Sequence, residues 1–261
     1  MGKEQSARII RVVPIARGIG KEELTYFTLK DVREGCIVSV PVRKKQVPAL
    51  VIGSEEAVFS RAELRSLPYG LRKISNIKSR ALLLPAFVEA AKDTARYFAT
   101  TTGAVLSALT PLSLGSEFKG PSSDLEYAPE AIHITPKENT TKQIPLLIQS
   151  ADEERIAAYR GIVREEFARG GSVFLCMPEV TEIERAAETL SRGIPEYTII
   201  LHAGISSKKL AALWMKGVTE KHPVLIIGTG QFLSIPRYDI KTIIIEKESS
   251  RAYKTPARPH A

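Results

Sequence analysis

Three consecutive cations, Arg43, Lys44 and Lys45, stand between two short runs of β-forming residues. This spacing places them at the tip of a hairpin, where cationic side chains can reach phosphate oxygens. Residues 1–115 contain 18 Lys and Arg against 10 Asp and Glu, whereas residues 116–261 contain 19 of each, so the whole net charge of +8 lies in the first part. We therefore expect an anionic partner for that part, with nucleic acid as the first candidate and acidic lipid or protein behind it.

Several other classes of protein are excluded by composition. No stretch approaches the roughly 20 apolar residues of a membrane span, and the N-terminus lacks the apolar run of a signal peptide. The two cysteines, Cys36 and Cys176, lie far apart, which argues against a disulfide framework and a Cys-rich zinc site. We expect a cytoplasmic protein without a cofactor, a bound metal or a membrane contact.

The first part of the chain reads as a small β-rich domain that would carry the cations. Polar or glycine-containing turns separate four short β-forming runs, at residues 8–13, 24–29, 36–40 and 47–52. This spacing predicts a small barrel. A helix is expected over residues 85–98, a break at the Thr-Thr-Gly of 101–103, and a second short helix over 104–109.

The second part alternates apolar runs with amphipathic stretches. The expected strands are 145–148, 172–177, 197–201, 223–227 and 241–245, and the expected helices are 152–169, 179–192 and 206–216. This alternation predicts βαβ units with a parallel sheet covered on both faces. The predicted organisation is a barrel-like domain over 1–115, a linker over 116–143 and an α/β domain over 144–261.

Residues 35–53 and 96–111 of the first part are similar to the 3′-DNA-binding domain of the primosomal protein N′ (PriA) family. Phe-Leu-Cys-Met-Pro-Glu at 174–179, Leu-His-Ala-Gly-Ile-Ser at 201–206 and Ile-Gly-Thr-Gly-Gln-Phe-Leu at 227–233 are similar to motifs of its first helicase lobe. The resemblance implies a DNA-binding domain followed by one RecA-like lobe, with a role in replication restart.

The resemblance also implies further DNA contacts. Tyr26 occupies the position of a tyrosine that helps to hold the 3′ end, where it could stack on a base. Thr25 replaces the neighbouring acid, so recognition of the 3′-hydroxyl is not expected. Gly228 and Thr229 would contact a DNA backbone through main-chain amides and the hydroxyl. Independently of the resemblance, Arg11 could extend the basic surface.

The lobe departs from the family where nucleotide would bind. A phosphate-binding loop needs the pattern G-x-x-x-x-G-K-[ST], and the resemblance aligns the residues 149–156 with it. Gln149 and Glu154 replace the glycines, Arg155 replaces the lysine, and Ile156 replaces the hydroxyl residue. Three consecutive carboxylates at 152–154 would also repel a triphosphate.

The metal-binding and hydrolysis motif of the family is changed as well. Its Asp-Glu-Glu-His corresponds here to Glu246-Lys247-Glu248-Ser249. Glu246 could still approach a metal, but Lys247 cannot accept a proton from water at neutral pH. We therefore expect a protein that binds forked or single-stranded DNA in replication restart without hydrolysing ATP, with single-strand-binding protein and other primosome proteins as further partners.

Two alternative functions remain open from the sequence. The first is an ATP-dependent 3′–5′ helicase of the primosome with an atypical motor. The second is a protein-interaction module of the replication machinery, whose basic face meets an acidic partner. His202 is a candidate general base by residue type. The sequence places no carboxylate beside it, so catalysis by His202 is not expected.

Overall fold

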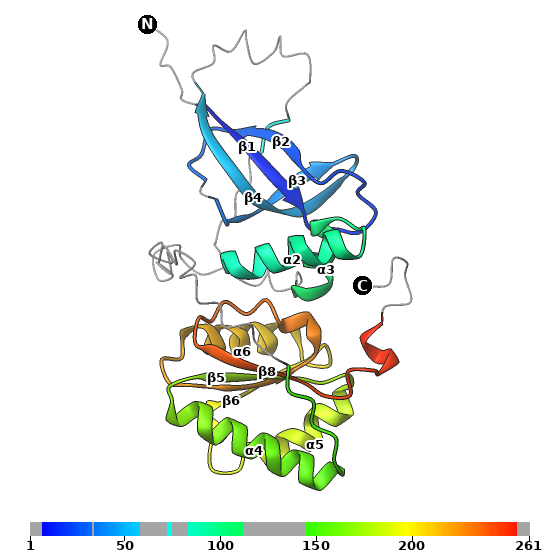
Figure 1. The fold of residues 1–261 in the computed structure, drawn as a ribbon. Coiled ribbons are helices and arrows are strands. Elements are labelled where there is room, and N and C mark those ends of the chain that lie inside the picture. The colour runs from blue at the N-terminus through cyan, green and yellow to red at the C-terminus, as the bar shows by residue number, and fades with distance from the viewer. Residues whose placement is uncertain (1–6, 33, 58–71, 75–82, 112–144, 255–261) are drawn as a thin grey trace, which may run out of the picture. The chain divides into compact units, whose positions relative to one another are not determined.

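The computed structural model describes residues 7–32, 34–57, 72–74, 83–111 and 145–254. The chain divides into two compact units (Figure 1). The first contains residues 1–112 with 230–237 and 250–261, and the second contains residues 113–229 with 238–249. The predicted linker and both of its boundaries lie outside the described residues.

An antiparallel sheet of four strands forms the body of the first unit (Figure 1). The strands are β1 (Ala7–Pro14), β2 (Leu24–Thr28), β3 (Ile37–Val42) and β4 (Lys45–Ala57), in the order β2-β1-β4-β3. The four β-forming runs of the sequence therefore become four strands, because their β-branched residues fit a half-buried pleated surface. The largest difference is at β4, which runs over Lys45–Ala57, whereas the apolar pattern predicted a strand over 47–52.

The sheet is curled so that a side chain links its two outer strands. The hydroxyl of Tyr26 on β2 donates a hydrogen bond to the carbonyl oxygen of Pro41 on β3 at 2.9 Å. Buried residues inside the curl include Ile10, Val40 and Val51, none of which is more than 1% exposed. The result is half a barrel, which confirms the expected barrel-like domain.

Two helices, α2 (Pro85–Tyr97) and α3 (Thr102–Leu109), complete the first unit. The predicted break between the two helices is present, but it falls at residues 98–101 instead of 101–103, and Gly103 lies in the first turn of α3. A Cβ atom at Gly103 would lie 1.9 Å from the carbonyl oxygen of Pro14 in β1. Glycine here therefore permits a close approach of helix and strand instead of ending a helix.

Helix α2 ends in a left-handed turn at a residue that is not glycine. Ala99 has φ of 49°, and the amide of Thr100 donates to the carbonyl of Ala95 at 2.9 Å. This is the hydrogen bond of a Schellman motif, whose left-handed position glycine usually fills. The helix end is therefore held in a conformation that costs free energy.

Ala99→Gly is expected to raise the free energy of unfolding by about 0.5–1 kcal/mol, since glycine relieves the strain but gains freedom in the unfolded chain. Urea unfolding followed by circular dichroism measures the change. Ala90→Gly, at an exposed position inside the same helix, should instead lower stability by about 1 kcal/mol. Equal losses in both variants would contradict the assigned helix end.

A parallel sheet forms the centre of the second unit, with helices on both faces (Figure 1). Its strands are β5 (Ser172–Cys176), β6 (Thr198–Leu201), β7 (Leu225–Gly228) and β8 (Ile240–Ile245), in the order β6-β7-β5-β8. Helices α4 (Asp152–Ala168) and α5 (Val180–Leu190) cover one face, and α6 (Ser207–Thr219) covers the other. A short 3-10 turn occurs at Pro195–Tyr197 in this unit, and two more, at Gly230–Phe232 and Arg251–Tyr253, lie in segments of the first unit. The expected α/β lobe is confirmed.

The predicted strand at 145–148 is wrong. These residues lack regular secondary structure, and Leu146 and Leu147 are 82% and 76% exposed. Among the described strands, β8 is an edge strand that pairs only with β5. Residues 145–148 border a pocket together with β8 but form no ladder with it. No helix in the described parts of the chain is long and apolar enough to cross a membrane.

Candidate functional site

The three cations singled out in the sequence occupy the tip of the β3–β4 hairpin. Val42 pairs with Lys45, so Arg43 and Lys44 form a two-residue turn, and all three basic residues are exposed. Arg43 has φ of 53°, in the left-handed region that hairpin turns usually fill with glycine or asparagine. The hairpin therefore carries a long cationic side chain at a strained position.

A fourth cation, Arg72, lies against the same turn, and sequence reasoning missed it. Its Nη1 donates to the carbonyl oxygen of Arg43 at 3.2 Å, while its own carbonyl accepts from the amide of Phe27 on β2. No local spacing relates position 72 to position 43, so only the fold brings them together. We call Arg43, Lys44, Lys45 and Arg72 the basic hairpin tip.

Arg11 and Thr25 are cross-strand partners on β1 and β2. The guanidinium of Arg11 lies over Gly53, where an added Cβ would be 2.9 Å from Nη2. Its Nη1 is 3.7 Å from a carboxylate oxygen of Glu23, and both side chains are about half exposed. An exposed pair of this length contributes little free energy, which leaves Arg11 able to exchange this partner for another anion.

Tyr26 does not fit the stacking role that the resemblance implies. The residue is only 5% exposed, because its ring packs in the core of the curled sheet and its hydroxyl is bonded to Pro41. Burial also raises the pKa of this hydroxyl. With its ring enclosed, Tyr26 joins β2 to the base of the hairpin and offers no free face to a base.

The candidate DNA-contacting residues of the lobe lie at the end of β7. Gly228 is close to Leu201, whose carbonyl oxygen would be 2.7 Å from an added Cβ. The amide of Thr229 donates to that same carbonyl at 3.3 Å, so this amide is already engaged within the lobe. Nearby His202 is buried and accepts a hydrogen bond from the amide of Gly204.

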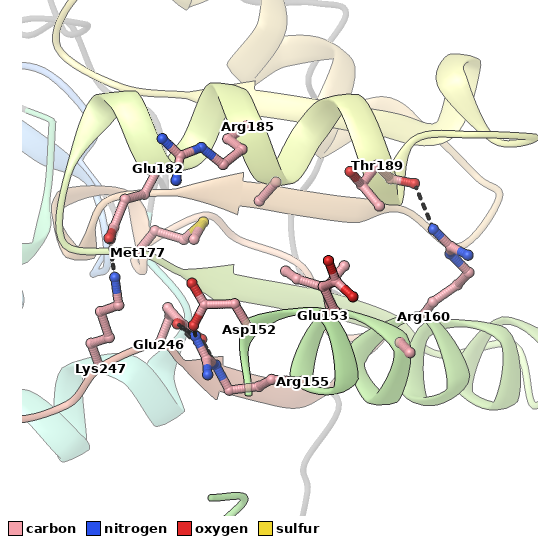
Figure 2. Close-up of a pocket in the computed structure, with 13 residues that line it drawn as sticks. Asp152, Glu153, Arg155, Arg160, Met177, Glu182, Arg185, Thr189, Glu246 and Lys247 are labelled. Atoms are coloured by element: carbon pink, nitrogen blue, oxygen red, sulfur yellow. Dashed lines mark hydrogen bonds and ion pairs between the residues drawn. The ribbon is translucent and has the colours of Figure 1, made fainter. Parts of the chain in front are cut away.

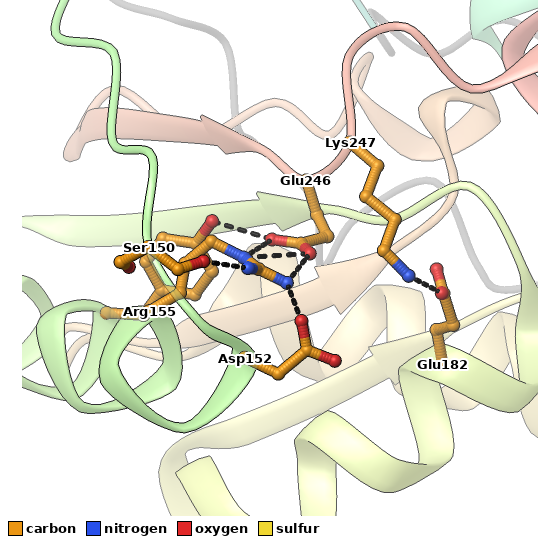
Figure 3. A network of polar contacts seen from close by, with 7 residues as sticks. Ser150, Asp152, Arg155, Glu182, Glu246 and Lys247 are labelled. Carbon is orange, nitrogen blue, oxygen red and sulfur yellow. Dashed lines mark hydrogen bonds and ion pairs between the residues drawn. The ribbon is translucent and has the colours of Figure 1, made fainter.

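The two positions aligned with the nucleotide-binding motifs meet in one buried ion pair (Figure 3). Nη2 of Arg155 lies 2.7 Å from Oε1 of Glu246, and Nε lies 3.1 Å from each oxygen of that carboxylate. The Arg155 side chain is 15% exposed and that of Glu246 is 4% exposed. Nη1 of Arg155 also donates to the carbonyl of Ser150 at 2.9 Å. Hydrogen bonds to Glu246 and then Asp152 raise the pKa of this guanidinium.

Tyr159 provides a second hydrogen bond to the buried carboxylate. Its hydroxyl donates to Oε2 of Glu246 at 2.6 Å, and burial together with this bond raises the pKa of Tyr159. Sequence reasoning missed Tyr159, although it lies four residues after Arg155 and therefore on the same helix face. Arginine and tyrosine from one turn of α4 thus share one acid from the end of β8.

Lys247, aligned with a catalytic carboxylate, points away from this pair and forms an ion pair with Glu182 on α5 (Figure 3). The hydrogen bond to Glu182 raises the pKa of the Lys247 amine. The same residues border a pocket of about 340 Å³ between α4 and α5 (Figure 2). Four cations and four carboxylates line this pocket, so its charges are balanced.

The acidic residues that replace a phosphate-binding loop begin helix α4. Asp152, Glu153 and Glu154 form its first turn, and no side chain caps the preceding Ala151. Carboxylates at a helix N-terminus interact favourably with the helix dipole. Arg155 donates to Asp152 at 2.8 Å and thereby lowers the pKa of that carboxyl. The carboxylates of these three residues therefore occupy the helix N-terminus, where a phosphate-binding loop would place the phosphates of a nucleotide.

Gln149 and Ile156 flank this turn, and both line pockets of the lobe.

The sequence is similar to known proteins over most of its length. Residues 12–111 match the family model described as the 3′DNA-binding domain of PriA. Over 241 residues the chain is 22% identical to a curated protein of Helicobacter pylori strain 26695, covering 90% of this chain and 36% of that relative. A second relative, from strain J99, shows the same identity and coverage. The chain therefore spans about a third of the length of these relatives.

The first unit is accordingly of the type found in 3′-DNA-binding domains, here followed by a parallel α/β lobe. Both curated relatives are named replication restart protein PriA. The chain is similar to these PriA proteins over most of its length, in agreement with the resemblance drawn from its motifs.

Proposed function

We propose that this protein binds forked or single-stranded DNA in replication restart, and that it does so without hydrolysing ATP. The observation that carries the proposal is the basic hairpin tip, four cations on a domain that matches a 3′-DNA-binding model. Lysine and arginine at such a tip bind phosphates and release counterions, which gives affinity without sequence preference. Arg11 on β1, beside Thr25 on β2, adds a further cation that can bind phosphate on the outer face of these strands.

Fluorescence anisotropy with a labelled fork, a single strand and a duplex, each at several salt concentrations, tests this binding. Affinity should fall steeply as salt rises, because each phosphate contact contributes a slope of about 0.7–0.9 in log–log form. No binding at low salt, or binding independent of salt, would exclude the proposal. Pull-down with and without nuclease separates DNA binding from contact with an acidic protein such as single-strand-binding protein.

Replacing Arg43, Lys44 and Lys45 together by alanine should weaken binding about 100-fold at moderate salt and lower the salt slope by about 2–3. The loss should be similar for all base sequences, since phosphates carry no sequence information. Alanine at Lys208, Lys209 and Lys221, three exposed lysines of the lobe, removes the same net charge and serves as the control. Equal losses in both variants would argue against a localised interface.

The absence of ATP hydrolysis is proposed from the Arg155–Glu246 pair. A nucleotide phosphate would have to draw Arg155 away from Glu246, whose carboxylate is buried. Removing the cation from a buried pair is costly. The carboxylates of the first turn of α4 would in addition repel the incoming phosphates.

Release of phosphate from ATP, measured with and without forked DNA, tests this second part. We expect no DNA-stimulated hydrolysis. Stimulated hydrolysis by pure protein that is lost in Glu246→Gln would instead assign an ATP-dependent helicase with an atypical site. Glu246→Gln retains the shape of the side chain and removes its charge, so it suits this comparison.

A further inference from the structure

Two adjacent aromatic rings are exposed at the end of helix α2. Tyr97 is 83% exposed and Phe98 is 48% exposed. The helical pattern of the sequence places Phe98 with the buried face, but the structure turns both rings outward. Single exposed apolar residues are common, whereas adjacent ones form a contiguous apolar patch of the kind that marks interaction sites.

The two rings support each other in a fixed arrangement. Their centroids are 4.9 Å apart and their planes meet at 84°, which is an edge-to-face contact. The left-handed turn at Ala99 ends the helix immediately after them. An aromatic residue that is already oriented loses little conformational entropy when a second ring stacks on it.

The surface beside the rings carries cations with weak partners. Arg96 pairs with Asp93, and Lys92 pairs with Glu89, each within one turn of α2 and exposed to solvent. Exposed pairs of this kind contribute little free energy and can be exchanged for other anions. Both rings also lie within residues 12–111, which match the 3′-DNA-binding domain.

We propose that Tyr97 stacks on an unpaired base of single-stranded DNA, with Phe98 bracing its ring. The inference rests on the proposed DNA binding and adds to it the contact that distinguishes an unpaired base from duplex. A free aromatic face accepts any base, so this contact favours single strands without selecting a sequence. Tyr26 is enclosed in the core, whereas Tyr97 has the accessible ring that stacking needs.

The test compares Tyr97→Ala with the wild type on two single-stranded oligonucleotides of equal length, one with bases and one abasic throughout. Both retain the same phosphates. On the oligonucleotide with bases, Tyr97→Ala should bind about 5- to 100-fold more weakly with an unchanged salt slope, because stacking releases no counterions. On the abasic oligonucleotide the two proteins should bind equally, and Tyr97→Phe should behave as the wild type on both.

The possible outcomes separate this inference from the proposed function. If the wild type binds neither oligonucleotide, the proposed binding of single-stranded DNA is itself refuted. If the wild type binds and Tyr97→Ala matches it on both, DNA binding stands and stacking by Tyr97 is refuted. Equal weakening on both oligonucleotides also refutes stacking, since the loss would then not depend on a base.

Discussion

Replacing Arg155 by alanine is expected to lower the free energy of unfolding of the α/β lobe by about 3–5 kcal/mol. The variant would leave the carboxylate of Glu246, which is 4% exposed, without its cationic partner. Tyr159 would still donate a hydrogen bond, but removing the cation from a buried pair is strongly destabilising. The loss therefore arises from the acid left behind more than from the net strength of the pair.

Fluorescence of Trp214 in urea measures this effect. It is the only tryptophan of the chain and lies buried in α6, so its signal reports on the lobe. Arg169→Ala is the matched control, because it breaks a solvent-exposed pair with Glu165 on the same helix and should cost no more than about 0.5 kcal/mol. Replacing Arg155 by Met together with Glu246 by Leu should recover most of the stability. An Arg155→Ala variant no less stable than Arg169→Ala would contradict the buried-pair interpretation.

Gly103→Ala is expected to destabilise the first unit by about 3 kcal/mol, the upper part of the range for overpacking. A Cβ atom 1.9 Å from the carbonyl oxygen of Pro14 cannot be relieved by a rotamer change, because the atom that it meets belongs to the backbone. Strand β1 and helix α3 would have to separate. Hydrogen exchange of the Ile10 and Val12 amides follows the stability of that strand directly.

Gly161→Ala provides the opposite case. Gly161 lies inside α4, and nothing lies within 4 Å of the position that its Cβ would take. Alanine there should stabilise the lobe by about 0.5–1 kcal/mol through helix propensity. If both glycine variants change stability in the same direction, close packing at Gly103 does not control the first unit.

The strands and helices were largely predictable because their signals are local. Apolar runs of β-branched residues became β1 to β8, and the alternation of strand and helix predicted a parallel sheet. The errors came where a local pattern depends on a distant neighbour. Residues 145–148 have the composition of a strand but do not pair with the edge strand β8, and Gly103 resembles a helix breaker only until Pro14 is seen beside it.

The candidate sites were predictable to a smaller degree. The cations at 43–45 needed only the spacing of two strands, whereas the contribution of Arg72 depends on a contact across 29 residues. Arg155 and Glu246 are 91 residues apart, and only the resemblance to a helicase lobe placed them at one site. Their direct pairing is a product of packing that no sequence motif expresses. The participation of Tyr159 could have been predicted, since a residue four positions after Arg155 lies on the same face of a helix.

The curl of the first sheet also bears on how the protein behaves at high concentration. A flat sheet of four strands has two long edges whose free amides and carbonyls can pair with other molecules. Here the hydroxyl of Tyr26 draws β2 toward β3 at Pro41, and proline has no amide to offer a neighbouring chain. Residues 72–74 also cover part of the β2 edge, because the Phe27 amide donates to Arg72 and the Ile74 amide donates to Phe27. These contacts leave less of the sheet edges open to intermolecular β-pairing, without a fully closed barrel.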